Sequence, residues 1–380
     1  MLASNLKVSQ AVDAQILGAE PVEGAELRPE RILELAERLH SNAGAKIAEI
    51  GSINRQARML AINALIEAAR AGAAGRGFAI VAEEMRRISG HIEAVTGALE
   101  TDVRADLREL GVIGEAILGH LRGQRLADLA LNAIEIIDRN LYERTCDVRW
   151  WATDSAVVDC CANPSPESSA HAAKRLGVIL GAYTVYLDLW VCDAQGRVLA
   201  SGRPERYPRV KAVSVADAPW FRQAMATRSG DEFAVADISP APALGDRLVA
   251  TYAAAIREDG AASGRAIGVL GVHFDWSPQA KAVVEGVRLT DEERKRSRVM
   301  LLDQNFRVLA SSDGSGVLRD TFPLAAAEGG MGAYPHGDGA MIGYALTPGY
   351  ETYCGLGWYG CIVQQPADGA KSATSVSSRS

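Results

Sequence analysis

The sequence predicts an all-α antiparallel coiled-coil hairpin followed by an α/β region built from two similar units in tandem. A heptad pattern on both sides of a short glycine cluster predicts the hairpin, and an internal repeat nearer the C-terminus predicts the tandem. The chain has 380 residues, of which 48% are hydrophobic and 23% charged, enough for two or three ordinary globular units. Its formal net charge of −7 excludes a general nucleic-acid binder, which needs clustered Lys and Arg to neutralise phosphates.

No membrane span is expected. The best apolar run, residues 176–186, is followed at once by Asp188, whereas a spanning helix needs roughly 20 mostly apolar residues. The N-terminus also lacks the basic region and apolar core of a secretory signal. These observations together predict a cytoplasmic location.

Residues 1–28 are polar and aperiodic, and we expect a flexible segment there. From Pro29 onward, residues recur in alternating steps of four and three, a spacing that keeps one seam facing a partner helix. Only one position of the seam, Lys46, is polar. The seam consists of Ile32, Ala36, Leu39, Ala43, Lys46, Ile50, Ile53, Ala57, Leu60 and Ala64.

Three glycines, Gly72, Gly75 and Gly77, interrupt this pattern and predict the turn of the hairpin, because helices tolerate such a cluster poorly. A second periodic arm begins at Phe78. Two arms of equal length place the hairpin over residues 29–123. Gly111, Gly114, Gly119 and Gly123 lie where the return arm loses its partner, and we expect the second helix to weaken there.

The residues around the turn are more specific than the seam. Segments 62–72 (INALIEAARAG) and 75–86 (GRGFAIVAEEMR) closely resemble the signalling tip of methyl-accepting chemotaxis proteins. A generic alanine-rich coiled coil, the plain alternative, shares the seam but not the polar Asn63, Glu67, Arg70 and Arg76 at these positions.

The resemblance implies a helical hairpin that forms a four-helix bundle as a homodimer, with trimers of such dimers as a further assembly of the family. It also implies two partners, the chemotaxis histidine kinase and its coupling protein. Carried over residue by residue, the contact surface consists of Ile62, Asn63, Ile66, Glu67 and Arg70 on the first arm and Phe78, Ile80 and Val81 on the second.

The tip departs from the family pattern after Gln56, where Ala57 and Arg58 replace the usual Thr-Asn pair. Arg58 adds bulk and charge where contacts between dimers are expected, and no Glu/Gln-rich methylation stretch is evident. Two functions therefore stay open. One is kinase control by a receptor, and the alternative is a non-catalytic scaffold that docks on receptor arrays.

The C-terminal two thirds begin with predicted helices over 126–161 and 167–181, interrupted by Pro164 and Pro166. Residues 193–201 (DAQGRVLAS) then recur 110 residues later as 303–311 (DQNFRVLAS), each copy after a β-type run. A strand, an Asp-led turn and a strand predict a hairpin in each copy. We expect a connecting helix and first unit over 124–295, a second unit over 296–365, and a disordered tail over 366–380.

This arrangement resembles a double Cache sensor, with two PAS-like sheets in series, and a pair of unrelated PAS-like folds is the alternative. The supporting motifs are 217–221 (DAPWF) and 268–276 (GVLGVHFDW). The resemblance implies a small-molecule ligand in the first unit. The candidate ligand residues are Trp220, Phe221, Asp237, Tyr252 and Asp275.

Each of these candidates has a plainer interpretation. Trp220 and Phe221 also suit a core, and Asp237 also suits the start of a turn. Amino-acid-binding members carry an Arg two residues before the Trp, where this chain has Ala218, which disfavours an amino-acid ligand. His273 is either a pH-sensitive group of the pocket or a satisfied buried histidine.

No catalytic motif is present: the sequence lacks a Gly-x-Ser-x-Gly elbow, a Walker loop and a His-Glu-x-x-His zinc motif. We therefore expect no enzyme, no cofactor and no metal. The six cysteines are scattered, and a redox sensor based on the adjacent Cys160 and Cys161 is a third, weaker hypothesis beside plain packing.

Overall fold

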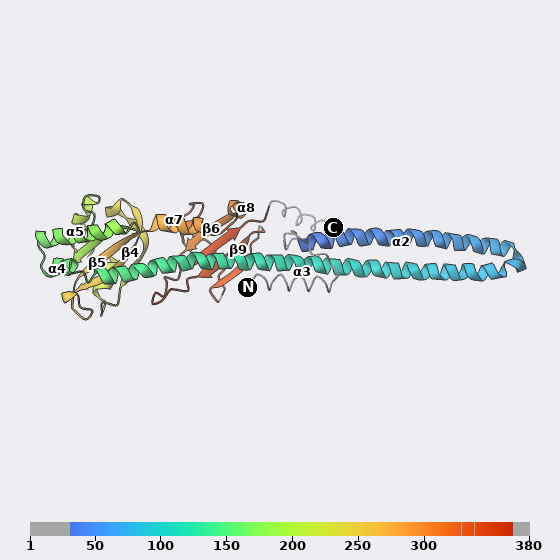
Figure 1. Ribbon diagram of the computed structural model, residues 1–380, viewed down its shortest axis with the longest axis horizontal. Helices are drawn as coiled ribbons and strands as arrows, with labels where there is room; N and C mark the ends of the chain where they lie inside the picture. Colours follow the sequence, from blue (N-terminus) through green and yellow to red (C-terminus); the bar gives the residue numbers. More distant parts are fainter. Residues whose placement is uncertain (1–30, 328, 338, 368–380) are drawn as a thin grey trace, which may run out of the picture. The chain divides into compact units, whose positions relative to one another are not determined.

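The computed structural model describes residues 31–327, 329–337 and 339–367, which form two compact units divided between Leu121 and Arg122. The first unit is helical, and the second contains helices and two sheets (Figure 1). The helices are α2 (Arg31–Arg70), α3 (Arg76–Trp151), α4 (Ser155–Ala162), α5 (Pro166–Ala182), α6 (Pro219–Met225), α7 (Trp276–Gly286) and α8 (Asp291–Lys295).

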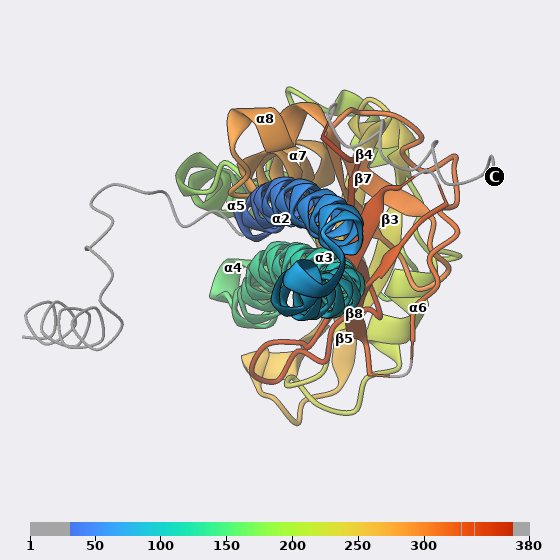
Figure 2. The same cartoon turned by 90° about the vertical axis from the view of Figure 1, so that its right-hand side faces the viewer.

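The first unit is an antiparallel pair of helices, α2 and the first part of α3, joined by the 3-10 turn Gly72–Gly75 (Figures 1 and 2). Buried positions recur every seven residues through both arms. They are Ile47, Asn54, Ala61, Ala68, Gly75, Ala82 and Ser89. Because most of these side chains are small, the two helix axes approach closely along this line.

Two contacts between the arms fix their register. The buried Asn54 side chain donates from Nδ2 to the backbone oxygen of Ser89 at 2.8 Å. One turn further along α2, Arg58 forms an ion pair with Glu93 across the hairpin, also at 2.8 Å. Arg58, the residue that departs from the family pattern, is therefore engaged within its own hairpin.

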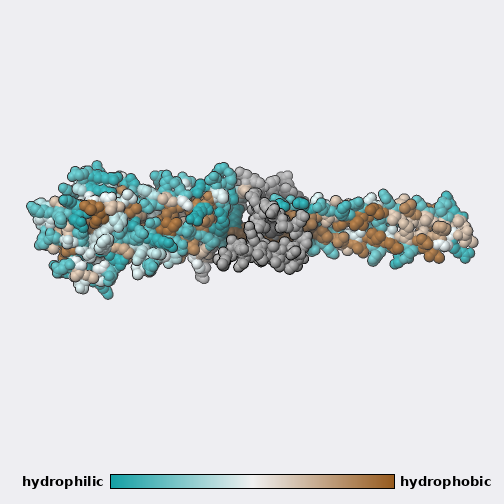
Figure 3. All heavy atoms as spheres, in the orientation of Figure 1, coloured by the Kyte–Doolittle hydropathy of each residue, from teal (hydrophilic) through white to brown (hydrophobic). Residues whose placement is uncertain are grey.

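The heptad seam predicted from the sequence is only partly the line of contact between the two arms. Ala36 is buried, but Leu39, Ile53 and Leu60 are 56%, 60% and 62% exposed. The physical reason is that two helices alone bury about one position per heptad, so the larger apolar residues beside that line remain uncovered. Figure 3 shows apolar side chains gathered along the hairpin.

The prediction that the second helix weakens at 111–123 is wrong for the described conformation, because α3 continues without a break from Arg76 to Trp151. In a helix, a glycine costs about 1 kcal/mol relative to alanine. The summed cost of four spaced glycines is not enough to interrupt a helix that tertiary packing stabilises further along the chain. Gly111 and Gly119 have open space where a Cβ would lie, so close packing does not explain their presence.

The second unit contains two five-stranded antiparallel sheets with the same strand order. The first module has the order β2-β1-β5-β4-β3 and the second module β7-β6-β10-β9-β8. The strands are β1 (Tyr186–Asp193), β2 (Val198–Ser201), β3 (Ala234–Ala241), β4 (Arg247–Arg257), β5 (Ala266–Asp275), β6 (Ser297–Leu302), β7 (Val308–Ser311), β8 (Met331–Pro335), β9 (Met341–Leu346) and β10 (Tyr359–Gln364). This topology confirms the predicted fold class of a helical hairpin followed by a tandem α/β region.

The sequence repeat forms the same turn in both modules. Asp193 accepts hydrogen bonds from the backbone nitrogens of Gln195 and Arg197 and from the Arg197 guanidinium. Asp303 accepts the equivalent three bonds from Asn305 and Arg307. Both aspartates are buried, so each turn is fixed by one carboxylate that its own loop satisfies.

The C-terminal half of α3 and both sheets share one hydrophobic core, to which α3 contributes Leu126, Ile134, Ile137 and Leu141. Two glycines allow the second sheet to lie directly on the helix. A Cβ at Gly360 would come within 2.2 Å of the Ala130 oxygen, and one at Gly343 within 2.5 Å of the Leu126 backbone. Larger residues at these two positions would force the helix off the sheet.

The predicted flexible segment 1–28 lies outside the described residues, as does nearly all of the predicted tail 366–380. The domain boundaries drawn from the sequence stay predictions. Across the described part of the chain, no helix combines the length and the hydropathy that a membrane crossing requires.

Candidate functional site

The residues predicted to contact the kinase and coupling protein lie on exposed helix surface near the turn. Phe78, Ile80 and Val81, at the start of α3, are 75%, 73% and 67% exposed. Ile62 and Ile66 of α2 are also exposed, as are Asn63, Glu67 and Arg70. Apolar side chains of this size so far into solvent are typical of a surface that a partner covers.

The charges at the tip are paired locally. Arg70 and Glu67 form an ion pair at 2.8 Å, and both side chains remain largely exposed. Surface pairs one helical turn apart add little stability, so their charges stay available to orient a partner. The tip thus combines a small apolar patch with fixed charges.

The three predicted turn glycines have different roles. Gly72 has a φ of +58°, a conformation that favours glycine. Gly75 lies against the end of α2, because a Cβ there would come within 2.2 Å of the Ala68 oxygen. Gly77 already belongs to α3 and has open space around its missing side chain.

In the first module, α6 places Trp220 and Phe221 against one face of the sheet, where both are buried. The Trp220 ring packs on Gly271 of β5, because a Cβ there would lie 3.2 Å from the indole. His273, two residues along the same strand, lies between Trp190 and Trp220, with ring centroids 3.9 Å and 6.0 Å away. We call Trp190, Trp220, Thr251 and His273, which are all buried, the aromatic cluster.

The His273 imidazole has one partner and one free nitrogen. Its Nδ1 lies 3.1 Å from the Thr251 hydroxyl, whereas its buried Nε2 has no hydrogen-bond partner among the described residues. Burial lowers the pKa of His273 to about 3, so the ring is neutral at physiological pH. A ligand with a hydrogen-bond donor or acceptor, according to the tautomer, could satisfy that nitrogen.

Beside the aromatic cluster, Asp188 forms the centre of a buried polar network. Its carboxylate accepts hydrogen bonds from the backbone nitrogens of Leu189 and Arg203, the Trp190 indole and the Ser201 hydroxyl, at 2.6–3.0 Å. Burial is the main influence on the Asp188 carboxyl and raises its pKa. The network fixes the Trp190 side chain that faces His273.

The other predicted ligand residues do not join Trp220 and Phe221. Tyr252 is fully buried in the core on the opposite face of the first sheet, because successive residues of β4 point to alternate faces. Asp237 forms an ion pair with Arg307 of the second module at 2.9 Å. Asp275 precedes α7 and pairs with Arg247 at 2.6 Å.

Sequence reasoning missed Asp188, Trp190 and Thr251 and left His273 undecided. One signal was available: Asp188 is a charged residue within an otherwise apolar strand, two positions from a tryptophan on the same face. Thr251 carries no such signal, because its place depends on the pairing of β4 with β5, where it lies opposite His273.

The cysteine pair has no reactive environment. Cys160 and Cys161 are buried, and burial raises the pKa of both thiols, which disfavours the thiolate that redox chemistry needs. Among the described residues, no group of three or more His, Cys, Asp and Glu side chains is placed to hold a metal ion.

Residues 30–105 match the family model described as the methyl-accepting chemotaxis protein (MCP) signalling domain, which confirms the recognition of the hairpin. A putative methyl-accepting chemotaxis protein AlkN of Alcanivorax borkumensis is 34% identical over 133 residues, 32% of this chain and 20% of that protein. McpN of Pseudomonas aeruginosa is 46% identical over 65 residues, 16% of this chain and 12% of that protein. The matched parts thus span a fifth or less of these two relatives.

Several solved sensor domains are similar to this chain at low sequence identity. The ligand-binding domain of the Pseudomonas fluorescens chemoreceptor CtaA with L-serine has a TM-score of 0.43 and 16% identity, covering 64% of this chain and 96% of that one. The sensory domain of the Campylobacter jejuni chemoreceptor Tlp3 has a TM-score of 0.48 and 16% identity, covering 64% and 92%. The part of the chain for which a family is matched is thus the hairpin, over residues 30–105.

The prediction of a cytoplasmic location is wrong. The chemoreceptor sensor domains to which this chain is similar, those of CtaA and Tlp3, are periplasmic domains of membrane receptors. The prediction rested on a missing apolar helix, and residues 1–30 lie outside the described part of the chain.

Proposed function

We propose that this protein is a chemoreceptor-type signal transducer that binds a small molecule in its first module and controls the chemotaxis histidine kinase through its hairpin tip. The observation that carries the proposal is the signalling-domain match over 30–105, which covers both arms around the turn. The exposed Phe78, Ile80 and Val81 give this tip the apolar surface that a protein partner needs.

Homodimerisation follows from the uncovered apolar face of the hairpin. Large apolar side chains lie exposed along both arms. Among them, Ile53, Leu60, Ile88 and Val95 are 48–62% exposed. A second copy packed along this face would complete a four-helix bundle and remove these side chains from water. Trimers of such dimers are a further assembly that the tip residues allow.

The proposed ligand binds between α6 and the first sheet, at the aromatic cluster. Two tryptophans supply apolar walls, and the unpartnered Nε2 of His273 supplies a polar contact. The nearby Arg203 guanidinium donates to three backbone oxygens, of Tyr186, Leu187 and Leu180, and is therefore already engaged. These contacts favour a small ligand whose binding does not require an arginine to pair with a ligand carboxylate.

Thermal-shift measurements on the full chain test the ligand proposal. A compound at 100 times its dissociation constant stabilises its receptor by roughly 2.7 kcal/mol. We expect a shift that Trp220→Leu abolishes and Tyr252→Phe retains, because Tyr252 lies on the other face of the sheet. If Tyr252→Phe loses the shift and Trp220→Leu retains it, the ligand binds on the Tyr252 face of the first sheet, which contradicts the proposal.

Reconstitution with a chemotaxis histidine kinase and its coupling protein tests kinase control. We expect the full chain to change the rate of kinase autophosphorylation, and Phe78→Ala with Val81→Ala to remove that change. Leu39→Ala is the control, because Leu39 is also apolar and more than half exposed but lies far from the turn.

The scaffold alternative predicts a different outcome of the same experiment. A chain that co-sediments with the kinase complex through its tip, yet leaves the rate unchanged with and without ligand, would be a docking protein. In both functions we propose that the protein itself is not an enzyme.

A further inference from the structure

Helix α3 is held at several points by the second module. Besides the direct backbone contacts at Gly343 and Gly360, Asp138 accepts hydrogen bonds from the Thr347 hydroxyl and the Gly349 nitrogen, at 2.6 Å and 2.9 Å. Burial, the main influence on the Asp138 carboxyl, raises its pKa, and these donors oppose that effect. The helix is therefore fixed to this sheet from about Leu126 onward.

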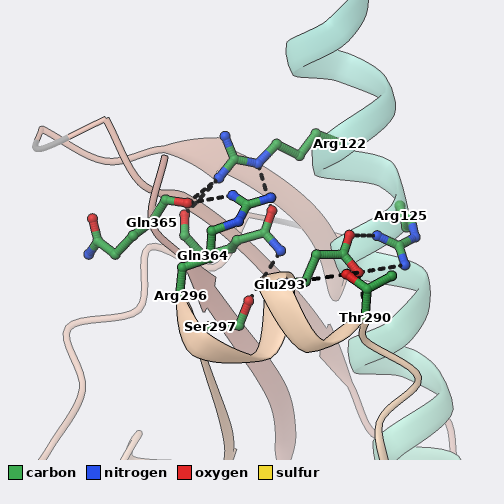
Figure 4. Close-up of polar contacts among 8 residues, drawn as sticks. All are labelled: Arg122, Arg125, Thr290, Glu293, Arg296, Ser297, Gln364 and Gln365. Atoms are coloured by element: carbon green, nitrogen blue, oxygen red, sulfur yellow. Dashed lines mark hydrogen bonds and ion pairs between the residues drawn. The ribbon is translucent and has the colours of Figure 1, made fainter. Parts of the chain in front are cut away.

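Two arginines extend this hold toward the hairpin (Figure 4). Arg122 donates to the Gln364 side chain at 2.8 Å and to the Gln365 backbone oxygen at 2.7 Å. Arg125 forms a two-pronged ion pair with Glu293 of α8. We call these five residues the clamp.

The partners of the clamp come from two informative places in the second unit. Glu293 belongs to α8, the short helix between the last helix of the first module and the first strand of the second. Gln364 and Gln365 lie at the end of β10, the last strand. A rearrangement of either module that displaces α8 or the end of β10 would thus change the contacts of Arg122 and Arg125.

Glu293 is itself held in place, because its carboxylate also accepts from the nitrogen and hydroxyl of Thr290 in a capping box. Arg296, next to α8, donates to the same Gln365 oxygen as Arg122, at 2.6 Å. Arg296 therefore ties the end of α8 to the end of β10, beside the contact that Arg122 makes there.

On the other side of the clamp, α3 contains Gly119, Gly114 and Gly111. Open space surrounds the missing side chains of Gly111 and Gly119, so these glycines lower helix stability without a packing benefit. In this continuous helix, the order of 111–123 therefore depends on the packing that holds α3 further on.

We propose that α3 is the output element of the sensor and that the clamp is a latch that sets the order of the glycine-bearing segment 111–123. The signal then leaves the sensor toward its N-terminal side, through the helix that continues into the signalling hairpin. This inference rests on the proposed function for its purpose, but the latch itself is measurable without a kinase or a ligand.

Hydrogen–deuterium exchange of the full chain tests the latch. Arg125→Glu should raise the exchange rate of amides in 111–123 several-fold relative to wild type, whereas the double variant Arg125→Glu with Glu293→Arg should restore it. Lys295→Glu is the matched control. It reverses a charge on the same helix α8, at a residue that within the described part of the chain forms an ion pair with Glu292 alone. Equal exchange in Arg125→Glu and Lys295→Glu, or no restoration by the double variant, would overturn the latch.

The kinase assay then distinguishes failure of the latch from failure of the proposed function. Kinase output that Arg125→Glu shifts and the double variant restores supports the latch as the output device. If the wild-type chain controls the kinase and Arg125→Glu controls it equally well, the latch is overturned and the proposed function stands. A wild-type chain without effect on the kinase overturns the proposed function, even where exchange shows that the clamp orders α3.

Discussion

His273 lies fully inside the first module, where burial lowers its pKa from 6.5 to about 3. The neighbours that face it are uncharged, namely Trp190, Trp220 and Thr251. Because the unfolded chain takes up a proton near pH 6.5 and the folded chain does not, the folded state loses stability as the pH falls from 6.5 toward 3. Each pKa unit corresponds to about 1.4 kcal/mol.

We therefore predict that the free energy of unfolding of the full chain falls by a few kcal/mol between pH 7 and pH 4, in part through this residue. His273→Asn should flatten the profile, and urea titrations across that range measure the difference. His40→Asn, at an exposed site in α2, should leave the profile unchanged. Parallel profiles for wild type and His273→Asn would contradict the assignment.

Asp188 gives a second prediction at this scale. Its removal leaves four donors without their acceptor in a buried site. Asp188→Ala should lower the unfolding free energy by about 3–5 kcal/mol, a typical cost of breaking a buried charged network. The exposed Asp217→Ala is the control, and equal denaturation midpoints for the two variants would show that the network contributes little.

The residue scale also shows where sequence reasoning stops. The Asp-led turns at Asp193 and Asp303 were predictable, because a local repeat determines a local hydrogen-bond pattern. The arrangement of the candidate site was only half predictable. Trp220 and Phe221 follow a local motif, but the face on which Tyr252 lies depends on strand pairing, which no local pattern reveals.

At the scale of elements, the turn of the hairpin distinguishes two glycines that look alike in the sequence. A methyl group at Gly75 would collide with the Ala68 backbone, whereas one at Gly77 meets open space. We predict that Gly75→Ala destabilises the hairpin by about 1–3 kcal/mol. Gly77→Ala, its matched control, should instead stabilise the hairpin by about 1 kcal/mol through helix propensity.

Circular dichroism during thermal unfolding measures both effects. Two variants with the same midpoint would show that the close approach at Gly75 relaxes without cost. The pair also tests why the turn needs glycine at one position and merely tolerates it at another.

The helices illustrate the limits of prediction for elements. Periodicity located α2, α5 and the start of α3, since each has caps or a turn in its own sequence. It failed on the continuity of α3, because the packing of 122–151 against two sheets outweighs the local cost of four glycines. Tertiary contacts of this kind are invisible in a single helical segment.

At the scale of the whole molecule, the uncovered apolar face of the hairpin predicts a dimer. Leu60 is 62% exposed, and burying a leucine is worth about 1.5–3 kcal/mol. Leu60→Glu should therefore weaken dimerisation at least roughly tenfold, the factor that 1.4 kcal/mol represents. Sedimentation velocity across a concentration series measures the change.

Gln56→Glu, one turn away at an exposed polar position, is the control and should leave the dimer intact. A wild-type chain that sediments as a monomer at all concentrations would contradict the prediction.

The order of the two units has a consequence for biosynthesis. The hairpin precedes the sensor in the chain, so both of its arms emerge from the ribosome while the sensor is still being made. At typical synthesis rates the remaining chain takes on the order of 10–50 s, during which the apolar face of the hairpin is already exposed. The nearest second copy of the hairpin is then on a neighbouring nascent chain, made by another ribosome on the same messenger RNA. Pairing during translation would then favour two copies from the same transcript over mixed pairs with related receptors.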